Sequence, residues 1–261
     1  MNKKYWIWLS RIEGLGPIKI KQLLEIYKTP EEIWKLTKEE LIKTKGIGEI
    51  IANQILDEKY RMNLEQYVEY MEKYDIGIVT ILDEDYPKNL KNIYDAPIVL
   101  YYKGNKQLLN SNKIIAIVGC RNCTKYGENA SIKLAYDLSK EGICIISGMA
   151  KGIDSAAHYG AFKEKGKTIA VLGTGLDRIY PSENIKLYNE ILENGGLILT
   201  EYVIGTKANK LNFPARNRII SGLSNGVIVV EAKEKSGTLI TVDFALEQGK
   251  DVFAIPRQYY K

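Results

Sequence analysis

The fold is decided by the stretch from Ile114 to Gly148, IIAIVGCRNCTKYGENASIKLAYDLSKEGICIISG. It opens with the apolar run IIAIVG (114–119) and closes with ICIISG (143–148), and both runs are rich in β-branched residues. Between them, residues 127–141 have the apolar spacing of an amphipathic helix. A strand, a helix and a second strand in this order predict two parallel strands joined by a helical crossover.

The same alternation continues through the rest of the sequence. Amphipathic stretches at 153–165, 182–193 and 238–248 predict further helices. We therefore expect an α/β fold over residues 113–261, with a Rossmann-like, doubly wound and mostly parallel sheet. The remaining strands, each expected to be buried on both faces, are TIAVLGTG (168–175), LILTEY (197–202), GVIVVEA (226–232) and DVFAIP (251–256).

Residues 1–75 have a different pattern, and we expect a small all-α domain there. It contains a degenerate repeat, IEGLGPIKIKQLLEIY (12–27) and TKGIGEIIANQIL (44–56), whose first glycines are 46 − 14 = 32 residues apart. The repeat resembles a pair of helix-hairpin-helix elements, in which a Gly-x-Gly turn leaves backbone N–H groups free for a phosphate. The alternative is a small bundle in which these glycines only turn the chain. Lys19, Lys21 and Lys45 would supply charge in the first case.

The segment between the two units is expected to be irregular. A longer helix is predicted at 57–73, and residues 76–112 are predicted to form a linker with edge strands that leads into the sheet. The reason is that Pro87 and Pro97 interrupt short apolar runs, and proline is confined to edge positions in sheets.

Composition limits the class of protein. The chain has 261 residues, 45% hydrophobic and 26% charged, and it has no run near the ~18 apolar residues of a membrane span. We expect a soluble, cytoplasmic protein with no membrane contact. The net charge of +5 lies in the second part, since residues 1–110 hold 17 basic and 17 acidic residues and residues 111–261 hold 20 and 15. This excess is a weak indication of a polyanionic partner.

The cysteines do not predict a metal or a redox centre. Cys120, Cys123 and Cys144 cannot all pair within one chain, and the single histidine, His158, is not placed near them by sequence spacing. We expect no metal and no cofactor. Cys120 and Cys123 are interpreted as residues of a tight turn, and Cys144 as a core residue of the second strand.

Glycine and basic residues gather where the predicted strands end. In an open parallel sheet, ligands bind beyond the carboxyl ends of the strands, and glycine-rich loops and helix starts there suit phosphate. Tyr126, Tyr180, Tyr202 and Phe213 lie near the same loops and would stack on bases or pack in the core. The loops predict a phosphate-binding crevice that contains Gly119, Arg121, Ser147, Gly148, Lys151, Gly152, Gly173, Gly175, Arg216, Arg218, Ser236, Gly237 and Thr238.

Several of these segments together resemble the DprA/Smf family of bacterial DNA-processing proteins. They are VGCRNCTKYG, SGMAKGIDSAAH, TIAVLGTGLDRIYPSEN, FPARNRIISGLS and VVEAKEKSGTLITVDFALEQGKDVFAIP, in family order across about residues 80–256. The resemblance implies a homodimer that binds single-stranded DNA, protects it and loads the recombinase RecA onto it in natural transformation. It also implies that Lys186 and Asn217 join the DNA-facing residues given above.

The sequence departs from the family pattern in three places. Cys120 stands where serine or threonine is common, and Ile255-Pro256-Arg257 where Val-Pro-Gly is common. The family often continues into a C-terminal winged helix, whereas this sequence ends at Lys261, so no function of that domain is predicted.

Two other functions are open to this sequence, although we expect no catalytic residues. Asp154 and His158 are four residues apart on one predicted helix face, which could form an acid–base pair, but each could equally serve the fold. An enzyme of this type would resemble the LOG phosphoribohydrolases, yet the stretch 235–241, KSGTLIT, has no glutamate at the expected place. A non-catalytic regulator that binds nucleotides is the second alternative.

Overall fold

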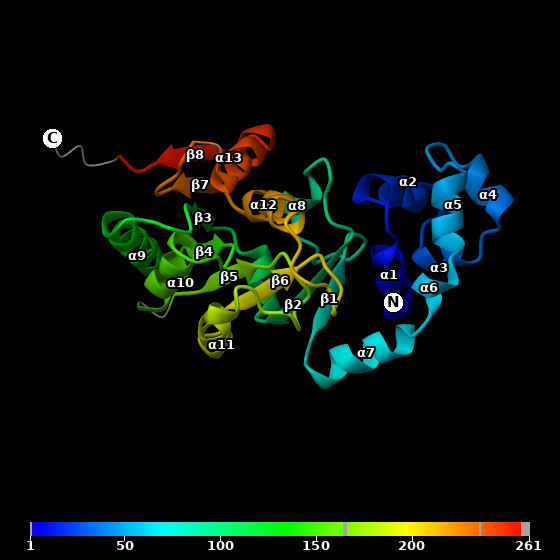
Figure 1. Ribbon diagram of the computed structural model, residues 1–261, viewed down its shortest axis with the longest axis horizontal. Helices are drawn as coiled ribbons and strands as arrows, with labels where there is room; N and C mark the ends of the chain where they lie inside the picture. The colour runs from blue at the N-terminus through cyan, green and yellow to red at the C-terminus, as the bar shows by residue number, and fades with distance from the viewer. Residues whose placement is uncertain (1, 164–165, 235, 257–261) are drawn as a thin grey trace.

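The computed structural model describes residues 2–163, 166–234 and 236–256, and these form an elongated molecule with a sheet at one end and a group of helices at the other (Figure 1). Within these ranges one eight-stranded sheet has the order β1-β2-β6-β5-β4-β3-β7-β8. Strands β3 to β8 run parallel to one another. Strand β2 is antiparallel to both of its neighbours, β1 and β6. The strands are β1 (Gly77–Thr80), β2 (Val99–Gly104), β3 (Ile114–Val118), β4 (Cys144–Ser147), β5 (Thr168–Val171), β6 (Leu197–Thr200), β7 (Gly226–Val229) and β8 (Asp251–Ala254).

Helices cover both faces of this sheet, which confirms the expected Rossmann-like fold. One face carries α9 (Lys125–Lys140), α10 (Ile153–Lys163) and α11 (Ile185–Glu193), and a 3₁₀ turn, η2 (Ser182–Asn184), precedes the last of these (Figure 1). The other face carries α12 (Asn212–Leu223) and α13 (Gly237–Glu247). The chain therefore changes faces between β3 and β7, which are neighbours through pairs such as Ile115↔Gly226. Residues 164–165, at the end of the helix expected over 153–165, lie outside the described residues.

The N-terminal helical unit was also expected and is confirmed. Its repeat places Gly14 and Gly46, both with positive φ, in the turns before α2 and α5. The expected helix over 57–73 is wrong in one respect, because it breaks at Asn63, whose φ is +60°. The helices are α1 (Lys3–Arg11), α2 (Pro17–Tyr27), α3 (Pro30–Trp34), α4 (Lys38–Lys43), α5 (Glu49–Leu56), α6 (Glu58–Arg61) and α7 (Leu64–Lys73).

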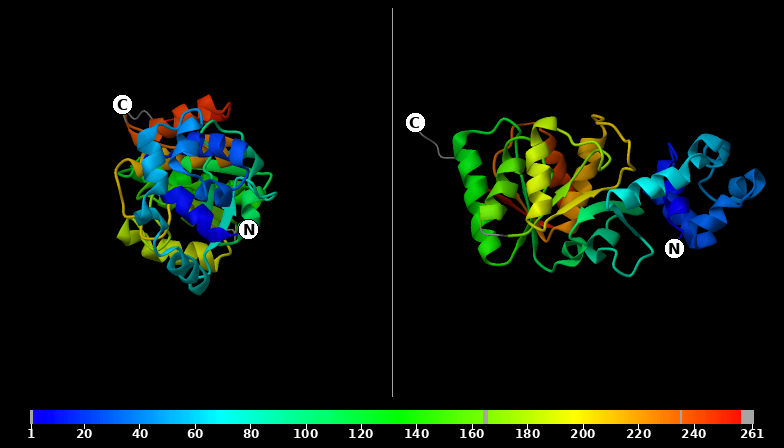
Figure 2. Two further views of the ribbon diagram at one scale, coloured as in Figure 1. Left: turned by 90° about the vertical axis from the view of Figure 1, so that its right-hand side faces the viewer. Right: turned by 90° about the horizontal axis from the view of Figure 1, so that it is seen from below.

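The segment after α7 attaches this unit to the sheet. It contains β1, β2, the short helix α8 (Lys88–Lys91) and a 3₁₀ turn, η1 (Lys106–Asn110), and β2 pairs with β6 through Tyr101↔Thr200. The views in Figure 2 place the helical unit beyond this edge of the sheet.

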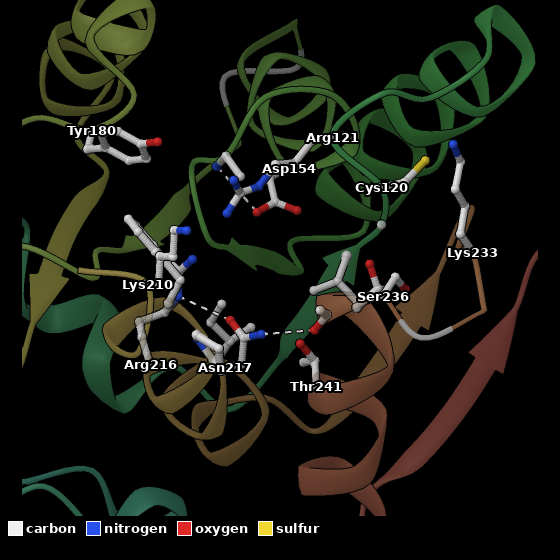
Figure 3. A pocket seen from close by; sticks show the side chains of 18 residues that line it. Cys120, Arg121, Asp154, Tyr180, Lys210, Arg216, Asn217, Lys233, Ser236 and Thr241 are labelled. Atoms are coloured by element: carbon white, nitrogen blue, oxygen red, sulfur yellow. Dashed lines mark hydrogen bonds between the residues drawn. The ribbon is translucent and has the colours of Figure 1, made fainter. Parts of the chain in front are cut away.

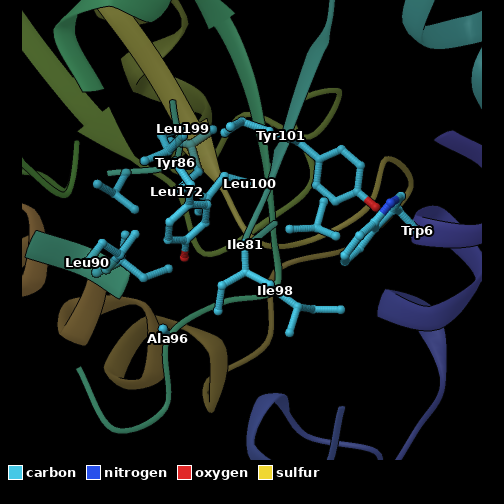
Figure 4. Close-up of a cluster of buried hydrophobic side chains, with 14 of the residues drawn as sticks. Trp6, Ile81, Tyr86, Leu90, Ala96, Ile98, Leu100, Tyr101, Leu172 and Leu199 are labelled. Carbon is cyan, nitrogen blue, oxygen red and sulfur yellow. The ribbon is translucent and has the colours of Figure 1, made fainter. Parts of the chain in front are cut away.

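One apolar core extends from the helical unit into the sheet. Trp6 of α1 and Tyr101 of β2 are both buried and face each other in the cluster drawn in Figure 4. Ser10 Oγ lies 2.8 Å from the Tyr101 hydroxyl, which joins the two units by a hydrogen bond as well. Among the described helices, none combines the length and the apolar character needed to cross a bilayer.

Candidate nucleic-acid interface

Basic and aromatic side chains gather at the carboxyl ends of β3 and β7, where the chain changes faces of the sheet. A cavity of about 480 Å³ opens there (Figure 3). This is the position at which doubly wound folds bind ligands. The side chains of four basic residues and one acid line it, namely Arg121, Lys210, Arg216, Lys233 and Asp154.

Arg121 stands beside two aromatic rings that are in contact with each other. It follows β3, and its Cζ lies 5.6 Å from the centre of the Phe213 ring. The ring of Phe213 is 5.1 Å from that of Tyr180, at an interplanar angle of 36°. Gly173 allows this arrangement, because a Cβ there would come within 2.8 Å of Phe213 Cδ1. A cation beside apolar ring faces is suited to the phosphate and the base of a nucleotide.

Arg216 is a second cation of the crevice, and the fold holds it in place. It lies on α12, is buried, and its Nη1 donates to the carbonyl oxygen of Gly148 at 2.8 Å and to that of Val171. Burial lowers the pKa of its guanidinium to about 10, and the nearby Asp154 opposes that shift. The other amino group, Nη2, lies where a Cβ on Gly148 would approach it to 2.6 Å. Glycine at 148 therefore leaves room for this positively charged group at the cavity wall.

Asp154 and His158 do not form the acid–base pair that their spacing allowed. Asp154 Oδ2 accepts a hydrogen bond from the N–H of Ala150 at 3.3 Å, and burial raises the pKa of its carboxyl. His158 Nδ1 instead lies 2.7 Å from Thr168 Oγ1, and burial lowers the pKa of the imidazole to about 3. Each side chain therefore serves the local structure.

The position of Arg218 differs from the one expected from the sequence. It was placed in the crevice with Arg216, but both lie on α12, where residues two apart point to nearly opposite sides. Arg218 Nη2 donates to Glu201 Oε2 at 2.6 Å, and its Nε lies 2.9 Å from Asp95 Oδ2. Its charge is neutralised by these carboxylates away from the crevice.

Apart from Lys186, the other predicted residues divide into three groups. Those at the main cavity are Gly119, Asn217, Ser236, Gly237 and Thr238; Gly148 and Lys151 line a second hollow of about 190 Å³ that also includes Arg121, Tyr180, Phe213 and Arg216. Behind these walls lie Ser147, Gly152, Gly173 and Gly175, which pack against neighbouring segments.

Lys186 lies outside both hollows. It is on α11, is largely exposed and lies 3.6 Å from Glu190. Lys151 also has a carboxylate neighbour, since its Nζ is 2.5 Å from Glu183 Oε1. Of these two lysines, the structure brings only Lys151 to the crevice.

Two basic residues at the crevice were not among those predicted from the sequence. Lys210 lies in the loop before α12 and Lys233 in the loop after β7. The signal was present, because both are lysines in segments that follow predicted strands. Of the tyrosines considered for stacking, Tyr126 and Tyr202 are outside the main cavity, and the Tyr202 hydroxyl is 3.5 Å from the Asn212 carbonyl oxygen.

The cysteines lie as the sequence predicted. Cys120 lines the cavity at the turn after β3, and Cys144 is buried in β4. All three described cysteines are free thiols, and burial raises the pKa of each. A raised pKa disfavours the thiolate form that redox chemistry and metal binding need.

Comparison with known proteins identifies the family of this chain. The model of the family "DNA recombination-mediator protein A" matches residues 77–261, and a SAM-like helix-hairpin-helix tandem matches residues 9–58. Protein Smf of Synechocystis sp. is 41% identical over 258 residues, which cover 98% of this chain and 65% of the relative's length. The chain thus spans slightly less than two thirds of that relative.

Two solved structures are similar over most of the chain. The structure of DNA processing protein A from Streptococcus pneumoniae has a TM-score of 0.82 and 40% identity, with 98% of this chain and 87% of that one covered. That of DNA processing protein A from Helicobacter pylori, solved to study how that protein binds single-stranded DNA, has a TM-score of 0.65 and 36% identity, with 71% and 82% covered. Since the family model matches more than half of the residues of this chain, the chain belongs to the DNA recombination-mediator protein A (DprA/Smf) family.

Proposed function

We propose that this chain binds single-stranded DNA in the crevice at the ends of β3 and β7. The observation that carries the proposal is the grouping of Arg121 and Arg216 with the rings of Phe213 and Tyr180 around one pair of hollows. Single strands are held by cations along the backbone and by flat side chains under the bases. The Helicobacter pylori relative, described as binding single-stranded DNA, supports this choice of ligand.

The biological role that we propose is that of a recombination mediator. In this role the chain protects incoming single-stranded DNA and loads RecA onto it during natural transformation, in the cytoplasm. Membership of the recombination-mediator family supports the role. The crevice acts by binding in this proposal, because Asp154 and His158 are each engaged with the fold and not with each other.

We further propose that the chain acts as a homodimer. The outer side of α13 and the neighbouring edge strand β8 support this, because Leu246 is 61% and Phe253 54% exposed. Large apolar side chains that lie exposed side by side are often covered by a partner. Sedimentation analysis at several protein concentrations tests it, and a monomer throughout would reject it.

The DNA site is tested by replacing one cation at the crevice and one outside it. Arg121→Ala should weaken oligo-dT binding by about 1–3 kcal/mol. It should also make the slope of log affinity against log salt less steep, by about the contribution of one phosphate contact. Lys186→Ala is the matched control, since Lys186 is an exposed cation outside both hollows. Fluorescence anisotropy over a salt series, with single- and double-stranded oligomers, measures both. Equal affinities and slopes for the two variants would reject the crevice as the DNA site.

A further inference from the structure

The N-terminal end of α13, with its N-cap residue, forms one wall of the cavity and carries hydroxyl groups. They belong to Ser236, Thr238 and Thr241, all of which line the cavity. Within the described part of the chain, the Oγ of Ser236 is buried and makes no hydrogen bond. Thr238 and Thr241 are only 8% and 2% exposed. Because a buried hydroxyl group is nearly always hydrogen-bonded, the unpartnered Ser236 Oγ, with the hydroxyls of Thr238 and Thr241 on the same wall, indicates a site for a ligand with several acceptor atoms.

The same wall presents the positive end of a helix. The first backbone N–H groups of α13 (Gly237–Glu247) have no acceptor within the helix, and an added Cβ on Gly237 would meet no atom within 4 Å. Open space therefore lies in front of donors that favour an anion. Figure 3 shows Ser236 and Thr241 on one side of the cavity and Arg216 and Lys210 on the other. The two walls are thus separate groups of donors.

We propose that this wall is a subsite for a phosphate monoester, supplied by the phosphorylated end of a DNA strand or by a free nucleotide. The proposal rests on the DNA-binding function given above. A monoester has three terminal oxygens and a charge near −2 at neutral pH, whereas the phosphodiester inside a strand has two such oxygens and one charge. Three hydroxyls, the helix N–H groups and Lys233 match the monoester. Arg121 and Arg216 remain available to the phosphodiesters that follow.

The size of the cavity agrees with a single terminal nucleotide. Its volume of about 480 Å³ is within the range of sites for small ligands, roughly 300–1,000 Å³. The excess of basic residues over acids around it, four against one, exceeds the charge of one phosphodiester. A terminal phosphate on the α13 wall with one phosphodiester at Arg121 would neutralise this excess.

The experiment compares oligo-dT molecules that differ only at their ends. Linear oligomers with a 5′-phosphate, a 3′-phosphate or hydroxyls at both ends, and a closed circle, are measured by competition against one labelled strand. We expect one kind of end phosphate to raise affinity about tenfold, the effect of about 1.4 kcal/mol of added hydrogen bonding. A deoxynucleoside monophosphate should compete better than its nucleoside if free nucleotides also enter. Equal affinity for all linear ends would overturn the proposal.

Variants of Thr241 assign the effect to this wall. Thr241→Val removes the hydroxyl and keeps the shape, so the ratio of affinities for phosphorylated and unphosphorylated ends should fall toward one. Thr241→Ser keeps the hydroxyl and should keep the ratio. A ratio that survives in Thr241→Val, in protein whose thermal unfolding shows it to be folded, would overturn the assignment.

The failure of this subsite can be distinguished from failure of the DNA site. Arg121→Ala should weaken phosphorylated and unphosphorylated strands alike. If the protein binds every strand with no preference for the kind of end, only the α13 subsite is rejected. If it binds no strand, the proposed function itself is rejected.

Discussion

Arg218 shows how the environment of a single residue decides its role. Its guanidinium is almost fully buried against Glu201 and Asp95, and these carboxylates raise its pKa above the usual value. Removing one partner of a buried ion pair leaves the other charge without compensation. Arg218 is therefore a stabilising residue of the fold, although the sequence places it two positions from a crevice residue.

We predict that Arg218→Ala lowers the free energy of unfolding by about 3 kcal/mol, because Glu201 would lose its buried partner. The matched control is Lys133→Ala, which breaks an exposed pair with Asp137 on α9 and should cost at most about 0.5 kcal/mol. Urea unfolding followed by circular dichroism measures both. Equal losses for the two variants would show that the Arg218 pair is not stabilising.

His158 provides a test of pH dependence. Burial is the main cause that lowers the pKa of its imidazole to about 3, and the charge of Arg216 adds to this. The unfolded chain, with a pKa near 6.5 at this group, then binds one proton more than the native state between about pH 6.5 and pH 3. Stability should consequently fall as pH drops below about 6.5, by up to about 1.4 kcal/mol per pH unit. Asp154 acts in the opposite sense, since its raised pKa makes stability fall as pH rises above about 3.8.

We predict that the His158 imidazole does not titrate between pH 8 and pH 5 in the folded protein. Because it is the only histidine, a single set of imidazole signals in a heteronuclear NMR spectrum reports it directly. A titration midpoint near 6.5 would show that the ring is exposed to solvent and would remove its contribution to the pH dependence of stability.

At the scale of elements, the positions of β3 to β8 were predictable, but the helices α8 and α12 were not predicted. Strand β8 is largely exposed and not buried on both faces as expected, because it lies at the edge of the sheet. Short β-branched runs that end in glycine fix β3, β4 and β5 to within a few residues. Helix α12 contains Pro214 and a Ser-Gly pair, which are typical of loops. Pro214 fits because it lies in the first turn, where an N–H has no acceptor within the helix.

The crevice was predictable only as far as the topology of the sheet reaches. Loops after parallel strands meet at one edge, which brings Arg121 to the start of α13. The sequence places Lys210 and Lys233 in loops that follow strands, but the paths of these loops depend on tertiary packing, so the sequence could not show that both lysines reach the crevice. The direction of a side chain on an unrecognised helix could not be predicted either, which is why Arg218 was misplaced.

The break between α6 and α7 is an element boundary set by one residue. Residues 57–73 contain no glycine or proline, so their sequence favours a continuous helix, yet Asn63 adopts a left-handed conformation with φ +60°. Asparagine tolerates this conformation better than most residues, and glycine better still.

We predict that Asn63→Gly leaves stability unchanged or raises it slightly, whereas Asn63→Ala lowers it by about 1 kcal/mol, because alanine is strained at positive φ. Asn129→Ala, at an exposed position within α9, is the control and should be neutral or stabilising, since alanine favours a helix. Chemical denaturation of the three variants compares them. A loss at Asn63→Gly as large as at Asn63→Ala would show that the asparagine side chain, and not its backbone conformation, is required.

At the scale of the molecule, the helical unit and the sheet share one core. Trp6, Tyr101 and Leu100 belong to the same buried cluster, and Ser10 bonds to the fully buried Tyr101 hydroxyl (Figure 4). Chains of two units often unfold in separate steps, because few contacts cross between the units. A continuous core should instead couple the stability of the helices to that of the sheet, and with it the position of β2 next to β6.

We predict that the whole chain unfolds in a single transition. The three tryptophans, Trp6, Trp8 and Trp34, all lie in the helical unit, so their fluorescence reports that unit, whereas far-UV circular dichroism reports the whole chain. The two urea curves should coincide. Ser10→Ala, which leaves the Tyr101 hydroxyl without its partner at a cost of about 1–3 kcal/mol, should move both midpoints together. If the fluorescence midpoint came at lower urea than the dichroism midpoint, the helical unit would unfold on its own and the contact through Tyr101 would not couple the two parts.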